Sequence, residues 1–265
     1  MIYKEDYPKY KRFFTFGCSF TEYKYPTWAN IMQRNMPDAE FYNLGSCGGG
    51  NVFIANRITE ANRVFNFCET DLVMVMWSTF CREDRYTYIK GWKLPGNIYS
   101  QNEYEFTTEE YIKTWGTPLT YLVRDLSIID LTTKYLDNLP CDSHLMFSVP
   151  IDHQQDLKCH KTRYILDVYS DLHNDYPDNM LELELDGDWV HGSRYKTSWS
   201  DDYRDYHPSP LRYANYLKKL NIHLSDESYQ YAIDSTNKLT MITDEAQFPD
   251  IFPHPDFKSI RTNML

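Results

Sequence analysis

The sequence lacks a long apolar segment and an excess of basic residues. No run of about 18 apolar residues occurs, so no segment is predicted to span a membrane. The N-terminal residues MIYKEDYPKYKRFF are charged and rich in tyrosine, which argues against a secretory signal. Lys and Arg total 27 against 38 Asp and Glu, a formal net charge of −11. Because nucleic acids and anionic membranes attract positive surfaces, we expect neither as a partner. Since neither a signal peptide nor a membrane span is visible, we expect a cytoplasmic protein.

The cysteines predict neither a disulfide framework nor a metal centre. The six Cys residues are scattered and none forms a CxxC pair, so we expect reduced thiols. One group of potential ligands fits no zinc spacing: Asp142, His144, Asp152, His153, Cys159 and His160. We therefore expect no metal and no cofactor.

Internal repeats, low-complexity tracts and Gly/Ser linkers are also absent, which favours a single domain over residues 1–265. Short apolar runs alternate with stretches of helical spacing. Strands are predicted at 12–17, 40–44, 71–77, 144–149 and, half exposed, 181–185; helices are predicted at 27–32, 51–68, 118–139, 158–173 and 210–220. This alternation predicts an α/β fold of three α/β/α layers with a mainly parallel, flavodoxin-like sheet.

Aromatic residues are abundant, with 23 Tyr, 14 Phe and 6 Trp. Many Tyr and Trp residues fall in 84–117, a polar and turn-rich stretch that we interpret as an insertion after the third strand. Tyrosine and tryptophan suit surfaces that are part wet and part apolar, so the insertion is either a wall that faces substrate or a packed cap. Residues 238–265 are interpreted as a Pro-rich extension, with 248–257 lying extended over the surface.

Three segments carry residues suited to chemistry. Ser19 directly follows the first strand, where a hydroxyl is exposed at the strand's carboxyl end. The glycines of 45–50 follow the second strand and can present amides to a negative charge, although their spacing fits neither a dinucleotide loop nor a P-loop. His207 lies just before a late helix that Ser209 and Pro210 begin, and it is placed to act as a general base.

In this order the segments resemble the SGNH (GDSL-type) hydrolase family. Gly17-Cys18-Ser19-Phe20-Thr21 is similar to the first block of the family, with Cys18 in place of the usual Asp. Gly48 is similar to the glycine of the second block, and Asp205-Tyr206-His207-Pro208 resembles the last block. The resemblance spans roughly residues 12–220.

Two departures from the family pattern stand out. The third block should carry an Asn after the third strand, but residues 76–82 contain none, so Ser78, Thr79 or Asn51 could supply the side-chain oxyanion donor. The last block should carry its Asp three residues before His207, where Arg204 stands. Asp205, two residues before His207, can still reach the ring, and Asp202 is the reserve.

The resemblance implies a serine ester hydrolase that works through an acyl-enzyme. Ser19 would be the nucleophile, His207 the base and Asp205 its orienting carboxylate. The N–H groups of Ser19 and Gly48 would hold the oxyanion.

The expected substrate is a small-molecule or carbohydrate ester, with an acetyl group preferred, and the expected substrate contacts are Trp77, Arg82 and Tyr86. The alternative is a non-catalytic carbohydrate-binding or structural module with the same fold. A lipase for long chains is less favoured, because no long apolar lid is evident.

Overall fold

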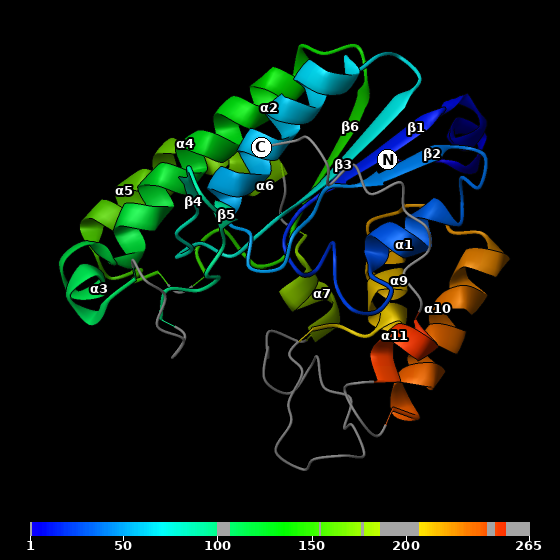
Figure 1. Ribbon diagram of the computed structural model, residues 1–265. Helices are drawn as coiled ribbons and strands as arrows, with labels where there is room; N and C mark the ends of the chain where they lie inside the picture. Colours follow the sequence, from blue (N-terminus) through cyan, green and yellow to red (C-terminus); the bar gives the residue numbers. More distant parts are fainter. Residues whose placement is uncertain are drawn as a thin grey trace.

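A parallel sheet of four strands forms the centre of the protein (Figure 1). The computed structural model describes residues 2–99, 107–153, 155–175, 178–185, 207–242 and 247–252. The strands are β1 (Arg12–Phe16), β2 (Glu40–Asn43), β3 (Asp71–Trp77) and β6 (Asp142–Phe147), in the order β2-β1-β3-β6. All three pairings are parallel, which confirms the predicted flavodoxin-like α/β fold.

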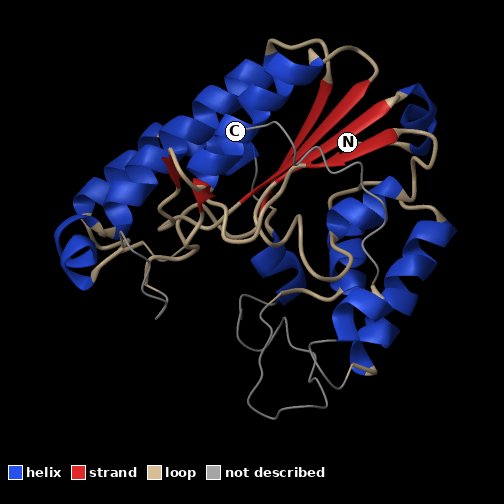
Figure 2. Cartoon of the chain, in the orientation of Figure 1, coloured by secondary structure: helices blue, strands red, loops and turns tan. Residues whose placement is uncertain are grey.

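Helices cover both faces of the sheet (Figure 2). One face carries α1 (Trp28–Gln33), α9 (Pro210–Lys219) and α10 (Asp226–Thr240). The other carries α2 (Asn51–Phe65), α4 (Pro118–Asp137), α5 (His160–Val168) and α6 (Ser170–Asp175). A 3-10 helix, η1 (Lys4–Lys9), precedes β1. Among the described residues, no helix combines the length and the apolar composition that crossing a bilayer requires.

Strand β3 is apolar from Leu72 to Trp77, after the charged Asp71 at its amino end. Leu72, Met74 and Met76 pack against the α1, α9 and α10 layer, whereas Val73, Val75 and Trp77 pack against the α2 and α4 layer. Successive side chains of a strand point to opposite faces, so the body of a strand that is covered on both sides carries apolar side chains on both.

Helix starts follow the expected capping chemistry. Thr117 caps α4 by accepting a hydrogen bond from the Thr120 N–H, and Pro118 takes the first helical position. Ser209 caps α9 through the Arg212 N–H in the same way, with Pro210 first in the helix. Both starts lie where the sequence predicts them.

The predicted fifth strand is wrong, because residues 180–185 form the helix α7 (Met180–Leu185). Met180, Leu181 and Glu184 are its buried side chains, and this spacing matches one face of a helix. The buried Glu184 carboxylate pairs with Lys219 at 2.8 Å. The alternation of Leu and Glu is typical of a half-exposed strand, and the sequence does not reveal that Glu184 is buried against Lys219.

The aromatic insertion contains regular structure. It includes an antiparallel hairpin, β4 (Arg85–Thr87) and β5 (Gly91–Lys93), and the helix α3 (Glu109–Trp115). The C-terminal prediction of extended chain is wrong for α11 (Phe248–Ile251), because Phe248 and Phe252 lie one turn apart and bury against Tyr25 and Leu239. Residues 253–265 lie outside the described residues.

A bidentate ion pair joins the amino ends of β1 and β3. Arg12 Nε and Nη2 lie 2.7 and 2.6 Å from the two carboxylate oxygens of Asp71, which is fully buried. Removing one partner of a buried pair leaves the other charge uncompensated. We therefore expect Arg12→Ala to lower the free energy of unfolding by about 3 kcal/mol, measured by denaturant unfolding.

Lys134→Ala is the matched control. Lys134 pairs with Asp130 at 2.7 Å on the surface of α4, and such exposed pairs contribute about 0.5 kcal/mol or less. Equal losses in the two variants would contradict the role given to the buried pair.

Candidate functional site

Ser19 lies in a tight turn at the carboxyl end of β1. The Thr21 and Glu22 N–H groups both donate to the Cys18 carbonyl, at 2.9 and 3.1 Å, so the chain reverses around Ser19. Ser19 is 7% exposed, and its hydroxyl makes no hydrogen bond with any residue that the structure describes. Because β1 lies between β2 and β3, this turn occupies the point where the strand order reverses, at which ligands bind in such sheets.

Thr21 fixes the shape of this turn. Its carbonyl accepts hydrogen bonds from Thr27 Oγ1 at 2.7 Å and Asn43 Nδ2 at 2.9 Å. Its hydroxyl accepts from Trp28 Nε1 at 3.2 Å. A Cβ at Gly17 would collide with that hydroxyl, which explains the glycine before Cys18. The start of α1 and the end of β2 therefore both hold the Ser19 turn.

His207, which precedes α9, lies next to the Ser19 turn. Its ring stacks on Tyr23 at a centroid distance of 3.9 Å and meets Phe20, the neighbour of Ser19, edge-on at 5.3 Å. Its carbonyl accepts a hydrogen bond from the Tyr25 hydroxyl at 3.3 Å. Within the described residues no hydrogen bond joins His207 to Ser19, so the fold brings their neighbourhoods together without that contact.

The carboxylates predicted to orient His207 lie outside the described residues. These carboxylates are Asp205 and its reserve Asp202, and Arg204 lies outside the described residues as well. Their assignments stay predictions.

The glycine loop lies directly beside the Ser19 turn. The Ser46 N–H donates to the Gly17 carbonyl at 3.1 Å, which links the two loops. Gly48 has φ +78°, a conformation that favours glycine, and a Cβ there would collide with the Leu94 carbonyl of the aromatic insertion. Gly48 is therefore held between the loop after β2 and the segment after β5.

Asn51 ties this loop to the end of β3. Its Oδ1 accepts a hydrogen bond from the Ser78 N–H at 2.9 Å. Its Nδ2 donates to the Ser78 carbonyl at 3.3 Å and to Asp125 Oδ2 at 3.0 Å, which uses both amide hydrogens. In this arrangement Asn51 acts as an internal clamp and has no amide hydrogen left for an oxyanion.

The two other donors predicted in place of the third-block Asn differ in their surroundings. The Ser78 hydroxyl is buried and has no hydrogen-bond partner among the described residues. Thr79 Oγ1 accepts from Arg82 Nε at 3.0 Å. Ser78 thus keeps an unused donor at the end of β3, although its hydroxyl is closed off from solvent.

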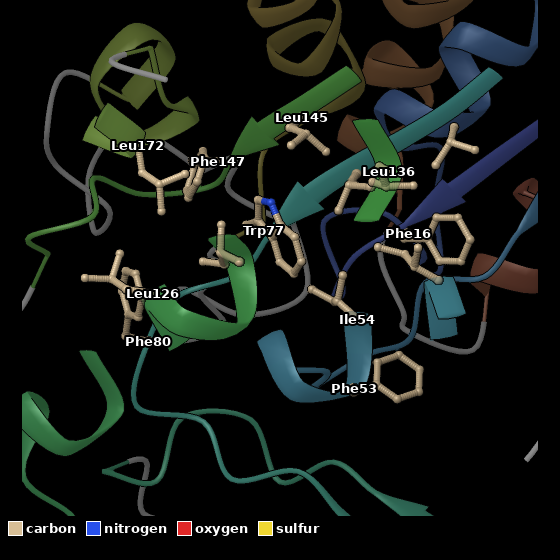
Figure 3. Packing of buried hydrophobic residues seen from close by; sticks show 14 of the residues in the cluster. Phe16, Phe53, Ile54, Trp77, Phe80, Leu126, Leu136, Leu145, Phe147 and Leu172 are labelled. Atoms are coloured by element: carbon tan, nitrogen blue, oxygen red, sulfur yellow. The ribbon is translucent and has the colours of Figure 1, made fainter. Parts of the chain in front are cut away.

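The three residues predicted to contact substrate have different environments. Trp77 is fully buried among apolar side chains such as Ile54 and Leu126 (Figure 3). The prediction that it contacts substrate is therefore wrong for this structure, because no part of its ring is exposed. Arg82 donates from Nη1 to the Gly49 carbonyl at 2.9 Å and so braces the glycine loop. Tyr86, on β4, is 48% exposed and packs edge-on against Trp92.

Buried charges behind the glycine loop were not predicted. Asp84 accepts hydrogen bonds from the Gly50 and Phe53 N–H groups at 2.8 and 2.9 Å, and thereby caps the positive N-terminal end of α2. Burial raises the pKa of its carboxyl. A cap supplied from more than 30 residues away leaves no local pattern, so the sequence offered no signal for it.

Asp125, on α4, completes this buried network. Burial raises the pKa of its carboxyl to about 6, against the opposing effect of Arg124, whose Nε lies 2.6 Å away.

In the part of the chain that the structure describes, no three His, Cys, Asp or Glu side chains are grouped as a metal ion would require.

A search of solved structures finds two that are similar to this chain at low identity. One is a member of the lipolytic protein G-D-S-L family from Veillonella parvula DSM 2008, with 14% identity, TM-score 0.37, and coverage of 79% of this chain and 96% of that one. The chain is similar to that protein. The other is the YxiM protein from Bacillus subtilis, with 11% identity, TM-score 0.39, and coverage of 82% of this chain and 58% of that one. No protein-family model and no curated protein matches the sequence.

Gly48 and Gly91 provide a matched pair of substitutions. Both have positive φ, but a Cβ at Gly91 would meet no atom within 4 Å. We expect Gly91→Ala to cost about 1 kcal/mol of stability, from backbone strain alone. Gly48→Ala adds the collision with Leu94 and should cost more than about 2 kcal/mol in denaturant unfolding. Equal costs would contradict the close packing of the insertion on the glycine loop.

Asp125 makes a pH-dependent contribution to stability. Its pKa in the folded state is about 6, above its ordinary value, so the folded state binds the proton more tightly than the unfolded state does. The stability that this provides is lost as the pH rises through about 6. Asp125→Asn cannot ionise. Between about pH 4 and pH 7 we expect the free energy of unfolding of the wild type to fall relative to this variant, by on the order of 1–3 kcal/mol.

The control is Ser127→Ala, which changes a side chain on the same helix that carries no ionisable group. Its difference from wild type should stay nearly constant over this pH range. A constant difference for Asp125→Asn would show that its proton is not held more tightly on folding.

Proposed function

We propose that the protein is a serine ester hydrolase of the SGNH type. The observation that carries this proposal is the Ser19 turn at the carboxyl end of β1, which lies beside the glycine loop and near the ring of His207. The Ser19 hydroxyl makes no hydrogen bond with the residues that the structure describes. The order of these residues along the chain, and their resemblance to the family's blocks, support the same reaction.

The proposed reaction is acyl transfer to Ser19 and then to water. Ser19 Oγ attacks the ester carbonyl while His207 takes its proton, and the N–H groups of Ser19 and Gly48 stabilise the oxyanion. His207 then passes the proton to the leaving alcohol. A water molecule, activated by His207, hydrolyses the acyl-enzyme. Asp205 is the proposed partner that orients the imidazole and stabilises its charged form.

This mechanism requires the His207 ring to come within about 2.6–3.2 Å of Ser19 Oγ. Catalytic hydrogen bonds are often long without substrate and tighten in the complex. Stacking on Tyr23 and the hydrogen bond from Tyr25 to the backbone keep the ring next to the turn, which supports this adjustment.

The proposed substrate is a small acyl ester, with acetyl favoured and a carbohydrate as the alcohol. The acidic net charge of −11 favours such a neutral substrate over a nucleic acid or an anionic membrane. The aromatic insertion approaches Gly48 through the Leu94 carbonyl, so its segment after β5 lies next to the loop proposed to hold the oxyanion.

A non-catalytic module is the second candidate. It is favoured by the lack of a hydrogen bond between Ser19 and His207 among the described residues, and by the use of both Asn51 amide hydrogens inside the protein. A fluorophosphonate reagent separates the two functions. A hydrolase is labelled at Ser19, whereas a module shows neither labelling nor cleavage of p-nitrophenyl acetate.

Ser19→Ala tests the nucleophile. We expect kcat/KM for p-nitrophenyl acetate to fall by at least about 10³-fold, because the attacking oxygen is lost. The thermal unfolding temperature should stay nearly unchanged, since this hydroxyl makes no hydrogen bond with the described residues.

Ser127→Ala is the control, because Ser127 lies on α4 and its hydroxyl bonds to the Val123 carbonyl and the Tyr169 hydroxyl, away from the Ser19 turn. It should keep wild-type activity. Cleavage by Ser19→Ala at the wild-type rate would exclude Ser19 as the nucleophile.

A further inference from the structure

A pocket away from the Ser19 turn lies between α3, α4 and the start of β4. It has a volume of about 380 Å³, and its lining includes Glu83, Arg85, Tyr111, Trp115, Tyr121 and Arg124. None of these residues belongs to the proposed ester-cleaving site. The volume falls in the range of about 300–1,000 Å³ that is typical of small-molecule sites.

The charges around this pocket balance one another. The Glu83 carboxylate accepts hydrogen bonds from Arg85 Nε at 3.0 Å, Arg124 Nη1 at 3.3 Å and the Tyr121 hydroxyl at 3.1 Å. Arg124 also bonds to Asp125 at 2.6 Å. The lining thus holds two guanidinium groups and the Glu83 carboxylate, and the fully buried Asp125 behind Arg124 supplies the second negative charge. Because the charges are paired in this way, we expect a neutral ligand rather than a phosphate, a carboxylate or a cation.

Aromatic rings supply the rest of the pocket surface. Trp115, at the end of α3, is 63% exposed, which is a large apolar surface to leave in water. Tyr121 is buried beneath the Arg124 guanidinium, which lies 4.6 Å from its ring centre. Trp115 therefore offers a flat apolar face beside fixed polar groups. Such a surface matches a sugar ring, which presents C–H groups on its faces and hydroxyls at its edge.

The pocket is connected to the glycine loop through Arg82. Arg124 Nη2 donates to the Arg82 carbonyl at 2.7 Å, and the Arg82 guanidinium donates to the Gly49 carbonyl at 2.9 Å. Arg82 therefore connects the pocket wall to the loop that contains Gly48.

We propose that this pocket binds a neutral oligosaccharide. Trp115 stacks on a sugar ring, and the Glu83, Arg85 and Arg124 cluster bonds to its hydroxyls. The role of this saccharide as the alcohol part of the ester rests on the proposed function, whereas its binding does not depend on Ser19.

The test uses the full chain carrying Ser19→Ala, so that no ester chemistry interferes. Xylotetraose, cellotetraose and chitotetraose are titrated by calorimetry and tryptophan fluorescence, with tetragalacturonate as the anionic comparison. We expect at least one neutral tetrasaccharide to bind, tetragalacturonate to bind more weakly, and Trp115→Ala to weaken binding about tenfold or more. Trp115→Phe should recover part of the affinity.

Tyr88→Ala is the matched control, because Tyr88 is fully exposed in the same insertion and does not line the pocket. It should leave binding unchanged. Absence of binding by all three neutral sugars, a preference for tetragalacturonate, or full binding by Trp115→Ala would overturn the proposal. If the wild-type protein cleaves no ester but Ser19→Ala still binds a neutral tetrasaccharide, the proposed hydrolase is refuted and the proposed sugar site is supported.

Discussion

The side-chain amide of Asn51 connects three elements at the carboxyl end of the sheet. It bonds to both backbone groups of Ser78 after β3 and to Asp125 on α4, while Asn51 itself begins α2. Because the glycine loop runs straight into α2, this clamp sets where the loop lies relative to the strands. Asp84 holds the same helix end from the insertion side. The position of the glycine loop beside the Ser19 turn depends on these buried polar contacts, which are costly to leave unsatisfied.

A second set of contacts holds the Ser19 turn itself. Thr21 is bonded from α1 and from the end of β2, and Gly17 leaves room for its hydroxyl. The turn is thus rigid around a serine hydroxyl that is itself unbonded among the described residues. Rigid support around one free polar group is the arrangement that a nucleophile needs, since positioning is fixed before substrate arrives.

The sequence was sufficient for the four parallel strands and for the starts of two helices. Continuous apolar runs identified β1 and β3, and the Ser-Pro and Thr-Pro starts located α9 and α4, because these signals are local. The alternation in 181–185 was misleading, since the burial of Glu184 depends on Lys219 from another helix. Trp77 was expected to face substrate, but the packing of α2 and α4 encloses it. The roles of Asn51, Asp84 and Asp125 come from contacts between distant segments, which no local pattern encodes.

The central claim is that Ser19, Gly48 and His207 act on one ester. A crystal structure of the protein treated with a small alkyl fluorophosphonate tests it most directly. We predict a covalent bond from Ser19 Oγ to phosphorus, with a phosphoryl oxygen about 2.7–3.1 Å from the Ser19 and Gly48 nitrogens. The His207 ring should lie within about 3.2 Å of an oxygen of the adduct. An unmodified Ser19, or an adduct whose oxygen points away from Gly48, would contradict the account.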